Sequence, residues 1–219
     1  MAQPGKITAL DPGKPAVVVA EGSQDVMALQ RLVEDLRRHD ILVGCAGGGG
    51  EAFLAELKAI TTLPHFTDWV KSLAVVADAD DDPSEAFRSI CAALDHASRN
   101  GIRLVPPPRP GTYSSADPRV GVFLWPMPGK KGCLESLCLG SVAGDGRIPC
   151  IAQYLTCAKD AGAQLATAIS QRCKARAHAF MATTPDPRAG VGAGFDHRRN
   201  VWDMNSPVWQ PIKDFLQQL

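Results

Sequence analysis

The stretches VVVAEG (residues 17–22) and LAVVADADDDP (residues 73–83) decide the fold. Each begins with a short apolar run that ends at a breaker, a pattern typical of a strand buried in a parallel sheet. A helical pattern follows each run, so both acidic clusters should lie beyond the carboxyl ends of the strands, where α/β sheets bind ligands. Carboxylates that meet at such an edge repel each other unless a cation lies among them. The two stretches therefore predict a metal site.

The rest of the first half alternates strand and helix patterns. Strands are expected at residues 41–45, 102–105 and 120–125, and helices at 24–38, 52–60 and 84–100. Such alternation predicts an α/β fold, a mostly parallel sheet of about four strands flanked by helices. Beyond it, helical patterns cover residues 133–139, 148–160, 163–182 and 207–219. We expect an α/β core over residues 1–127 and a C-terminal helical appendage over residues 128–219 that packs on this core.

Composition limits the classes of function. The 219 residues carry 23 basic and 23 acidic side chains, a balance that argues against bulk electrostatic binding of nucleic acid but leaves room for local basic patches. Seven cysteines without a CxxC pair favour reduced, packed thiols over a zinc site. Residues 1–13 do not form a signal peptide pattern, and no apolar run is long enough for a membrane span. We expect a cytoplasmic protein with no membrane partner.

The acidic residues differ in what else they could do. Asp82 precedes Pro83 and Glu85 and fits a helix N-cap, and Asp81 is expected to be solvated. Asp78 and Asp80 come directly after a buried strand, where Mg²⁺ finds the oxygen ligands it prefers. Glu21 would add a third carboxylate from the neighbouring strand end.

The segment after Glu21 has a structural explanation of its own. Ser23 could cap the following helix, and Asp25 is favoured in the first turn of that helix by its dipole. Neither residue is therefore assigned to the metal by position alone.

These residues carry a resemblance to a known family. A strand followed by Glu21-Gly22-x-x-Asp25 and a helix, and then a strand followed by Asp78-x-Asp80, resembles the Toprim domain of topoisomerases, bacterial primases, recombination proteins and OLD-type nucleases. The segments VGVFLWPMP (120–128), GCLE (132–135), KARA (174–177) and PIKDFL (211–216) also resemble small stand-alone Toprim-related bacterial proteins, so the resemblance extends along the chain.

The resemblance implies chemistry at nucleic-acid phosphodiesters that depends on Mg²⁺ or Mn²⁺. Glu21 would act as general acid/base or metal ligand, and Asp78 and Asp80 would hold the metal. Asp25 and Glu135 are the candidates for a second metal. Two cations would stabilise both the attacking and the leaving oxygen of an in-line displacement.

The resemblance also implies a lysine near the scissile phosphate. Lys174 is the candidate, and a solvated helix face is its structural alternative. The chain has only Tyr113 and Tyr154 for a topoisomerase nucleophile, and no zinc module for a primase. A metal-dependent nuclease in bacterial DNA metabolism or defence is the interpretation that remains first.

Two alternatives stay open. One is a non-catalytic nucleic-acid-binding or regulatory module that works with a protein partner or as a homo-oligomer. The other is a phosphatase or phosphotransferase, because a DxD after a strand also suits aspartyl-phosphate chemistry.

Two further segments could contact a nucleic acid, either DNA or RNA. Residues 46–50 form a glycine-rich turn that could help to hold a phosphodiester. Residues 185–199 are expected to form a mobile loop that ends in positive charge and, with the basic residues of 172–178, to steer the backbone.

Overall fold

A computed structural model describes residues 5–98 and 102–219. Its centre is a five-stranded sheet with the strand order β2-β1-β3-β5-β4. The strands are β1 (Ala16–Ala20), β2 (Ile41–Cys45), β3 (Ser72–Asp78), β4 (Thr112–Tyr113) and β5 (Arg119–Trp125). All neighbours pair in parallel except β4, which runs antiparallel to β5 at the edge. The α/β class and the mostly parallel sheet are confirmed, whereas the prediction of about four strands missed β4.

The expected strand at residues 102–105 does not form. Only Ile102 makes an isolated bridge, and the chain from residue 103 to the start of β4 is irregular. The N–H of Leu104 donates to the Ser98 hydroxyl at 2.9 Å instead of to a neighbouring strand. Pro106, Pro107 and Pro108 lack the N–H that a ladder needs, so no strand can continue beyond residue 105. The preceding helix ends at Ala97, and the last residues predicted for it lie outside the described residues.

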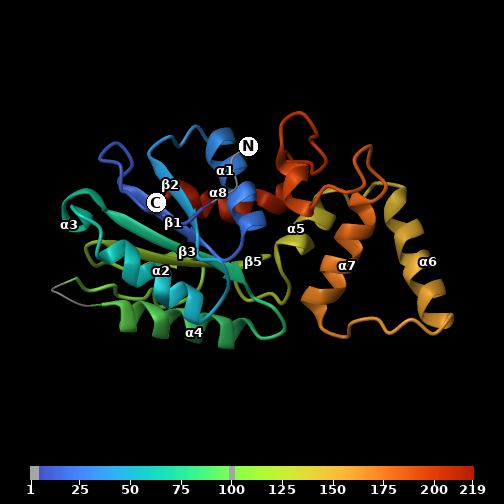
Figure 1. Ribbon diagram of the computed structural model, residues 1–219, viewed down its shortest axis with the longest axis horizontal. Coiled ribbons are helices and arrows are strands. Elements are labelled where there is room, and N and C mark those ends of the chain that lie inside the picture. The colour runs from blue at the N-terminus through green and yellow to red at the C-terminus, as the bar shows by residue number, and fades with distance from the viewer. Residues whose placement is uncertain (1–4, 99–101) are drawn as a thin grey trace.

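Helices cover both faces of the sheet (Figure 1). They are α1 (Ser23–Asp35), α2 (Glu51–Thr61), α3 (Phe66–Trp69), α4 (Pro83–Ala97), α5 (Leu134–Ser141), α6 (Arg147–Asp160), α7 (Ile169–Met181), η1 (Val191–Phe195), η2 (Pro207–Trp209) and α8 (Gln210–Gln217). The predicted helix over residues 163–182 begins only at Ile169.

Alternate residues of β1 show how the faces are divided. Ala16, Val18 and Ala20 join a hydrophobic cluster with α1, α5, α7 and α8, while Val17 and Val19 join a second cluster with α2 and α4. This division follows from the period of two in a strand. Residues 128–219 thus share one hydrophobic core with a face of the sheet.

The strand order creates a switch point beside β1. From β1 the chain passes through α1 to β2 on one side, and then crosses back to β3 on the other side. In open α/β sheets, ligands bind in the crevice beyond the strand ends where the order reverses in this way. The carboxyl ends of β1 and β3 are therefore the place where this fold favours a site.

The basic segment near the C-terminus, residues 185–199, is a loop that a short helix interrupts. Residues Val191–Phe195 form the 3₁₀ helix η1, in which Val191 and Phe195 are buried in the same hydrophobic cluster as α1. Two of the side chains that flank η1 have acidic partners, with Arg199 2.8 Å from Asp186 and His197 3.1 Å from Glu34. η1 therefore packs against the core, whereas the basic residues 197–199 that follow it are exposed.

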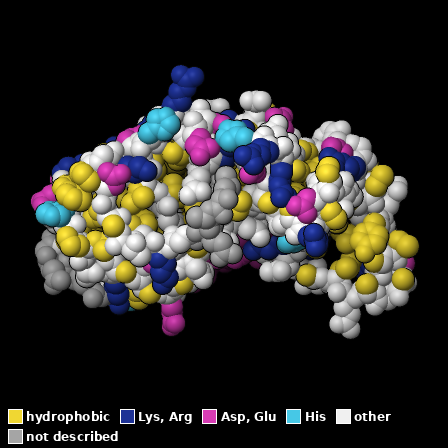
Figure 2. Space-filling model, turned by 45° about the horizontal axis from the view of Figure 1, so that its top comes forward, with side chains coloured by type: hydrophobic (Ala, Val, Ile, Leu, Met, Phe, Trp, Pro, Cys, Tyr) yellow, Lys and Arg dark blue, Asp and Glu magenta, His cyan; other side chains and the backbone are white. Residues whose placement is uncertain are grey.

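The surface carries both signs of charge. Figure 2 shows basic and acidic side chains intermixed on the face it presents, with hydrophobic side chains exposed at both ends of the molecule. The large hydrophobic side chains that are exposed are Tyr154, Leu165 and Ile169.

Among the described residues no helix combines the length and the apolar character that crossing a membrane requires. All seven cysteines lie in the described ranges, and all are free thiols.

Candidate metal centre

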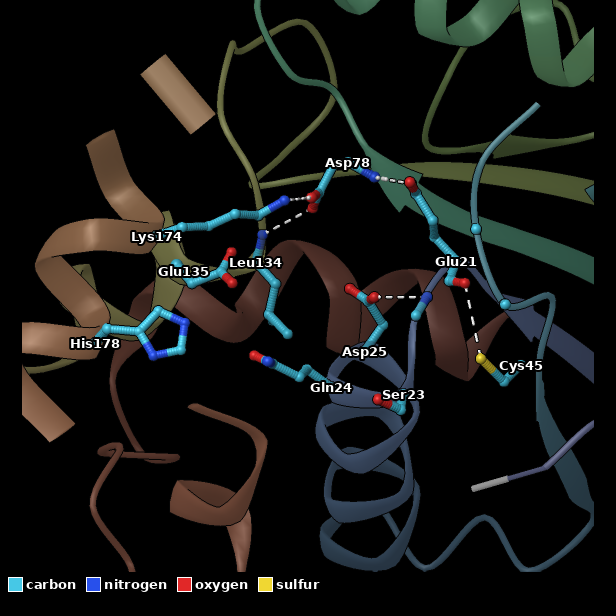
Figure 3. Close-up of a pocket in the computed structure, with 13 residues that line it drawn as sticks. Glu21, Ser23, Gln24, Asp25, Cys45, Asp78, Leu134, Glu135, Lys174 and His178 are labelled. Carbon is cyan, nitrogen blue, oxygen red and sulfur yellow. Dashed lines mark hydrogen bonds and ion pairs between the residues drawn. The ribbon is translucent and has the colours of Figure 1, made fainter. Parts of the chain in front are cut away.

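A pocket of about 540 Å³ lies at the carboxyl ends of β1 and β3 (Figure 3). Four carboxylates line it: Glu21 and Asp78 follow the two strands, Asp25 comes from α1, and Glu135 comes from α5. Lys174 and His178 of α7 complete the wall on the side of Glu135. The structure therefore brings together four of the five predicted metal ligands and the predicted lysine.

Glu21 is held by the backbone of two neighbouring segments. Its Oε2 accepts a hydrogen bond of 3.2 Å from the N–H of Asp78, and its carbonyl oxygen accepts from the N–H groups of Gly47 and Gly48 at 3.1 and 2.9 Å. The glycine-rich turn thus lies directly against the strand end, as its position in the sequence suggests. Burial raises the pKa of Glu21, opposed in part by the hydrogen bond from Asp78.

Asp78 is the last residue of β3 and links the two halves of the pocket. Its Oδ1 accepts from the N–H of Leu134 at 3.0 Å, and its Oδ2 lies 3.1 Å from Nζ of Lys174. Burial raises the pKa of Asp78 to about 6, although the charge of Lys174 acts in the opposite direction. An ammonium partner normally lowers the pKa of a carboxylate. Because the pKa of Asp78 is raised in spite of Lys174, its surroundings strongly disfavour the charged form.

Asp25 caps its own helix while it faces the pocket. Its Oδ2 accepts from the N–H of Gly22 at 2.9 Å, and Gly22 is the N-cap of α1. The prediction that Ser23 is the cap is wrong, because α1 already begins at Ser23. Asp25 is 8% exposed, and its burial, followed by the charge of Asp78, raises its pKa to about 8.

Glu135 is the least satisfied of the four carboxylates. Its side chain is 5% exposed, and Oε2 has no hydrogen-bond partner among the described residues. It lies in the first turn of α5, where the helix dipole favours a negative charge. A buried carboxylate oxygen without a partner is costly, so its position in the pocket wall indicates a ligand that the chain itself does not supply.

Asp80, the fifth predicted ligand, lies outside the pocket lining. It is exposed, has a positive φ of 47°, and its backbone pairs with Gly132 through two hydrogen bonds of 2.8 Å. The turn after β3 therefore leaves Asp80 exposed beside the pocket, not in its lining. Its charge nevertheless contributes to the raised pKa of Glu21, which places it within electrostatic reach.

The two following aspartates have structural roles. Asp82 caps α4 and accepts from the N–H groups of Ser84 and Glu85 at 3.0 Å, as predicted. Asp81 accepts from the N–H of Ile169 at 2.8 Å and so caps the first turn of α7, instead of being merely solvated.

Lys174 points into the pocket instead of lying on a solvated helix face (Figure 3). Burial alone would lower its pKa, but the charge and hydrogen bond of Asp78 raise it above its ordinary value. The ammonium group therefore stays charged and occupies the place of a counter-ion beside Asp78.

Sequence patterns do not single out Gln24 or His178 as pocket residues. His178 follows Lys174 by four residues on α7, and this helical spacing is the one signal that could have placed it on the same face. Gln24 lines the pocket from α1, and its Oε1 is buried without a partner among the described residues.

The donor set fits a divalent cation. Carboxylates converge in a partly buried pocket, each adds to the electrostatic cost of ionising another, and one buried oxygen lacks a partner. A cation among them would favour the ionised form of all four, since opposite charges lower carboxylate pKa values. Carboxylate oxygens are also the ligands that Mg²⁺ and Mn²⁺ prefer.

Comparisons with known proteins give a family but no activity. A search of curated proteins and a search of solved structures both returned no match. One family model, described as "Protein of unknown function (DUF3226)", matches residues 15–219, which include the whole sheet and every pocket residue. The chain therefore belongs to the DUF3226 family.

Proposed function

We propose that this protein is a Toprim-like metal-dependent nuclease that hydrolyses phosphodiester bonds of DNA or RNA. The observation that supports this most is the convergence of Glu21, Asp25, Asp78 and Glu135 with Lys174 in one open pocket at the β1–β3 switch point. Four carboxylates and one ammonium suit a cation and a phosphate better than they suit an uncharged ligand.

The residues that would hold Mg²⁺ or Mn²⁺ are Glu21 and Asp78, with Asp80 beside them and Asp25 and Glu135 on the helices. A divalent cation bound there stabilises charge on phosphoryl oxygens and makes a water molecule more acidic. The chain's own residues account for the remaining requirements of the reaction.

Lys174 could contact either Asp78 or a phosphate oxygen of the substrate. Its Nζ lies 3.1 Å from Asp78, and it would be free to contact a phosphate oxygen if Asp78 held a cation. An ammonium group in a partly buried pocket stabilises the negative charge that develops on that oxygen.

Glu21 is suited to move a proton. Burial raises its pKa, which brings the carboxyl closer to the pH at which it can both accept and release a proton. The backbone contacts of Glu21 with Asp78 and the glycine turn fix its orientation toward the pocket.

A cleavage assay tests the proposal. Single- and double-stranded DNA and RNA are incubated with the wild type, Glu21→Gln and Asp78→Asn in Mg²⁺ or Mn²⁺, and Asp68→Asn, an exposed carboxylate of α3, is the matched control. We expect the two pocket variants to lose cleavage by a factor on the order of 10² or more and the control to retain it. Equal cleavage by all four proteins would remove the assignment of the site to this pocket.

The absence of cleavage by a folded wild type would favour the binding or regulatory module. The balance of 23 basic and 23 acidic residues supports that alternative, because it leaves a nucleic acid few sites of attraction beyond the pocket and the basic side chains of α7. A protein partner or a second copy of the chain would then supply the remaining surface.

The ion pair between Lys174 and Asp78 favours a second candidate, a phosphatase or phosphotransferase with Asp78 as nucleophile. Both oxygens of Asp78 already accept hydrogen bonds, which argues against a free nucleophile. Turnover of a phosphomonoester such as p-nitrophenyl phosphate, without cleavage of nucleic acid, would select this candidate.

A further inference from the structure

A buried thiol lies behind the carboxylates of the pocket. Cys133 is fully buried at the N-cap of α5, directly before Leu134, whose N–H binds Asp78. Ligand atoms of Asp78, Cys133 and Glu135 all lie within 4.8 Å of one another. Two of these residues line the pocket, and Cys133 closes the cluster from the protein interior.

We propose that Asp78, Cys133 and Glu135 form a three-ligand site for a thiophilic divalent cation, of which Zn²⁺ is the representative. This site is distinct in its chemistry from the all-oxygen site for Mg²⁺ or Mn²⁺, although the two share Asp78 and Glu135. The inference holds whether or not the pocket cleaves nucleic acid.

The geometry of the cluster is close to that of a bound zinc ion. With Zn–S of about 2.3 Å and Zn–O of about 2.0 Å, tetrahedral ligands are separated by roughly 3.3 to 3.5 Å. The separations of up to 4.8 Å in the cation-free structure therefore need to shrink by about an ångström or more, which rotation of the Glu135 and Asp78 side chains can supply. Three protein ligands leave the fourth position open toward the pocket, an arrangement typical of catalytic zinc sites.

Glu135 gives independent evidence that a ligand belongs here. It is 5% exposed, and its Oε2 has no partner among the described residues. A cation at the cluster would satisfy this oxygen and would offset the cost of burying its charge.

The surroundings of Cys133 suit a bound thiolate. At the start of α5 the Ser136 hydroxyl oxygen accepts the backbone N–H of Cys133 at 3.2 Å, and the same hydroxyl lies 3.8 Å from the Cys133 sulfur. Without a cation the thiol donates to the carbonyl oxygen of Ser170 at 3.6 Å. Coordination breaks this hydrogen bond and releases the thiol proton to solvent, because a coordinating thiol is deprotonated outright.

The thiolate ligand is the reason to expect Zn²⁺ at this site instead of Mg²⁺. Sulfur ligands select Zn²⁺ and similar soft or borderline cations, whereas Mg²⁺ demands near-octahedral oxygen ligands. Lys174 would have to leave Asp78 when the cation binds, since both compete for the same carboxylate.

Metal-binding assays test the site without reference to cleavage. The purified protein is titrated with Zn²⁺ in competition with a chromophoric chelator, and Co²⁺ is used as a spectroscopic probe for a thiolate-to-metal charge-transfer band. We expect one tightly bound Zn²⁺ per chain and a Co²⁺ charge-transfer band that Cys133→Ser abolishes. Cys173→Ser is the matched control, because Cys173 contacts Cys133 but lies outside the three-ligand cluster, and it should keep the band.

The outcomes separate clearly. A band that survives Cys133→Ser, or a wild type that binds no Zn²⁺, overturns the proposal. If Cys133→Ser does not fold, as judged by circular dichroism and thermal unfolding, Glu135→Gln replaces it, and we expect this variant to bind Zn²⁺ at least about tenfold more weakly. Unchanged Zn²⁺ affinity in folded Glu135→Gln would likewise overturn the site. Loss of Mg²⁺-dependent cleavage alone, with Zn²⁺ binding intact, would concern the nuclease proposal and not this one.

Discussion

Asp25→Asn should stabilise the metal-free protein, and increasingly so as the pH rises. The buried carboxyl of Asp25 has a pKa of about 8, whereas an aspartate in an unfolded chain has a pKa of about 4. Between these values the folded state keeps a proton that the unfolded state has lost. The stabilising contribution of the protonated carboxyl is therefore complete below pH 4 and disappears as the pH rises toward 8.

The magnitude follows from linkage. One additional proton bound by the folded state lowers the free energy of unfolding by about 1.4 kcal/mol for each pH unit gained. Between pH 5 and pH 7 the wild type should thus lose about 2 to 3 kcal/mol through this residue. The asparagine variant cannot ionise, and its carbonyl oxygen can still accept the hydrogen bond from Gly22 that now measures 2.9 Å. The variant therefore avoids this loss and keeps the cap.

Urea denaturation in EDTA at several pH values between 5 and 8 measures the difference in unfolding free energy between the two proteins. Asp95→Asn, on the exposed side of α4, controls for the removal of one charge. A difference between Asp25→Asn and the wild type that changes by less than about 0.5 kcal/mol over this range would refute the reasoning, since it would mean that Asp25 is ionised throughout. Addition of Mn²⁺ at pH 8 should reverse the order of stability, because only the wild type offers the carboxylate to the cation.

Three further changes test other contacts. Lys174→Gln should bind Mn²⁺ about fivefold more tightly than the wild type, because no ammonium then competes for Asp78. Isothermal titration calorimetry at pH 8.5 measures this, a pH well above the wild-type Asp78 pKa of about 6. Cleavage by the variant should fall. Gly49→Ala should reduce cleavage by about tenfold with little change in urea midpoint, since a Cβ there would lie 3.2 Å from Oε1 of Glu21 and displace it. Tyr113→Phe should cost about 1 to 1.5 kcal/mol in urea denaturation with an unchanged slope, because its hydroxyl donates at 3.1 Å to a main-chain carbonyl of α8.

Each of these predictions has an outcome that contradicts it. Weaker Mn²⁺ binding by Lys174→Gln would show that the lysine does not compete with a cation, and Arg172→Gln, an exposed change on the same helix, controls for charge. Full cleavage by Gly49→Ala would place the reacting groups away from Glu21. A Tyr113→Phe variant as stable as the wild type would show that the α8 carbonyl finds another partner.

The strand ends could be placed from sequence because the signal is local. Apolar runs that stop at Glu21 and Asp78 define two parallel strands, and parallel neighbours bring their carboxyl ends to one edge. Strand β4 could not be found in this way, because two residues at an antiparallel edge show no periodicity.

The far wall of the pocket depends on contacts that sequence spacing does not encode. Asp78 and Leu134 are joined by a hydrogen bond across 56 positions, and Asp78 and Lys174 by an ion pair across 96. The family resemblance suggested Glu135 and Lys174, but no pattern could place Cys133 beside them. The cysteine spacing argued only against a site built from cysteines, which leaves a single thiol among carboxylates undetected.

The turn after β3 separates the two aspartates of the DxD motif. Asp78 and Asp80 are two residues apart and would share a face if the strand continued. The strand stops at Asp78, and Asp80, with its left-handed backbone, is exposed and does not line the pocket. A DxD motif is therefore not evidence by itself that both carboxylates bind one cation.

The pocket is assembled from both halves of the chain, and this limits how the protein can be shortened. Glu21 and Asp78 come from the sheet, whereas Glu135 and Lys174 come from helices that follow it. A fragment that ends at residue 127 would keep three of the five charged groups of the pocket, Glu21, Asp25 and Asp78, and would leave Phe123 and Trp125 without the helices that now bury them. Such a fragment should aggregate before its chemistry could be measured. Loss of the C-terminal helices would consequently dismantle the pocket and expose the core of the sheet in the same step.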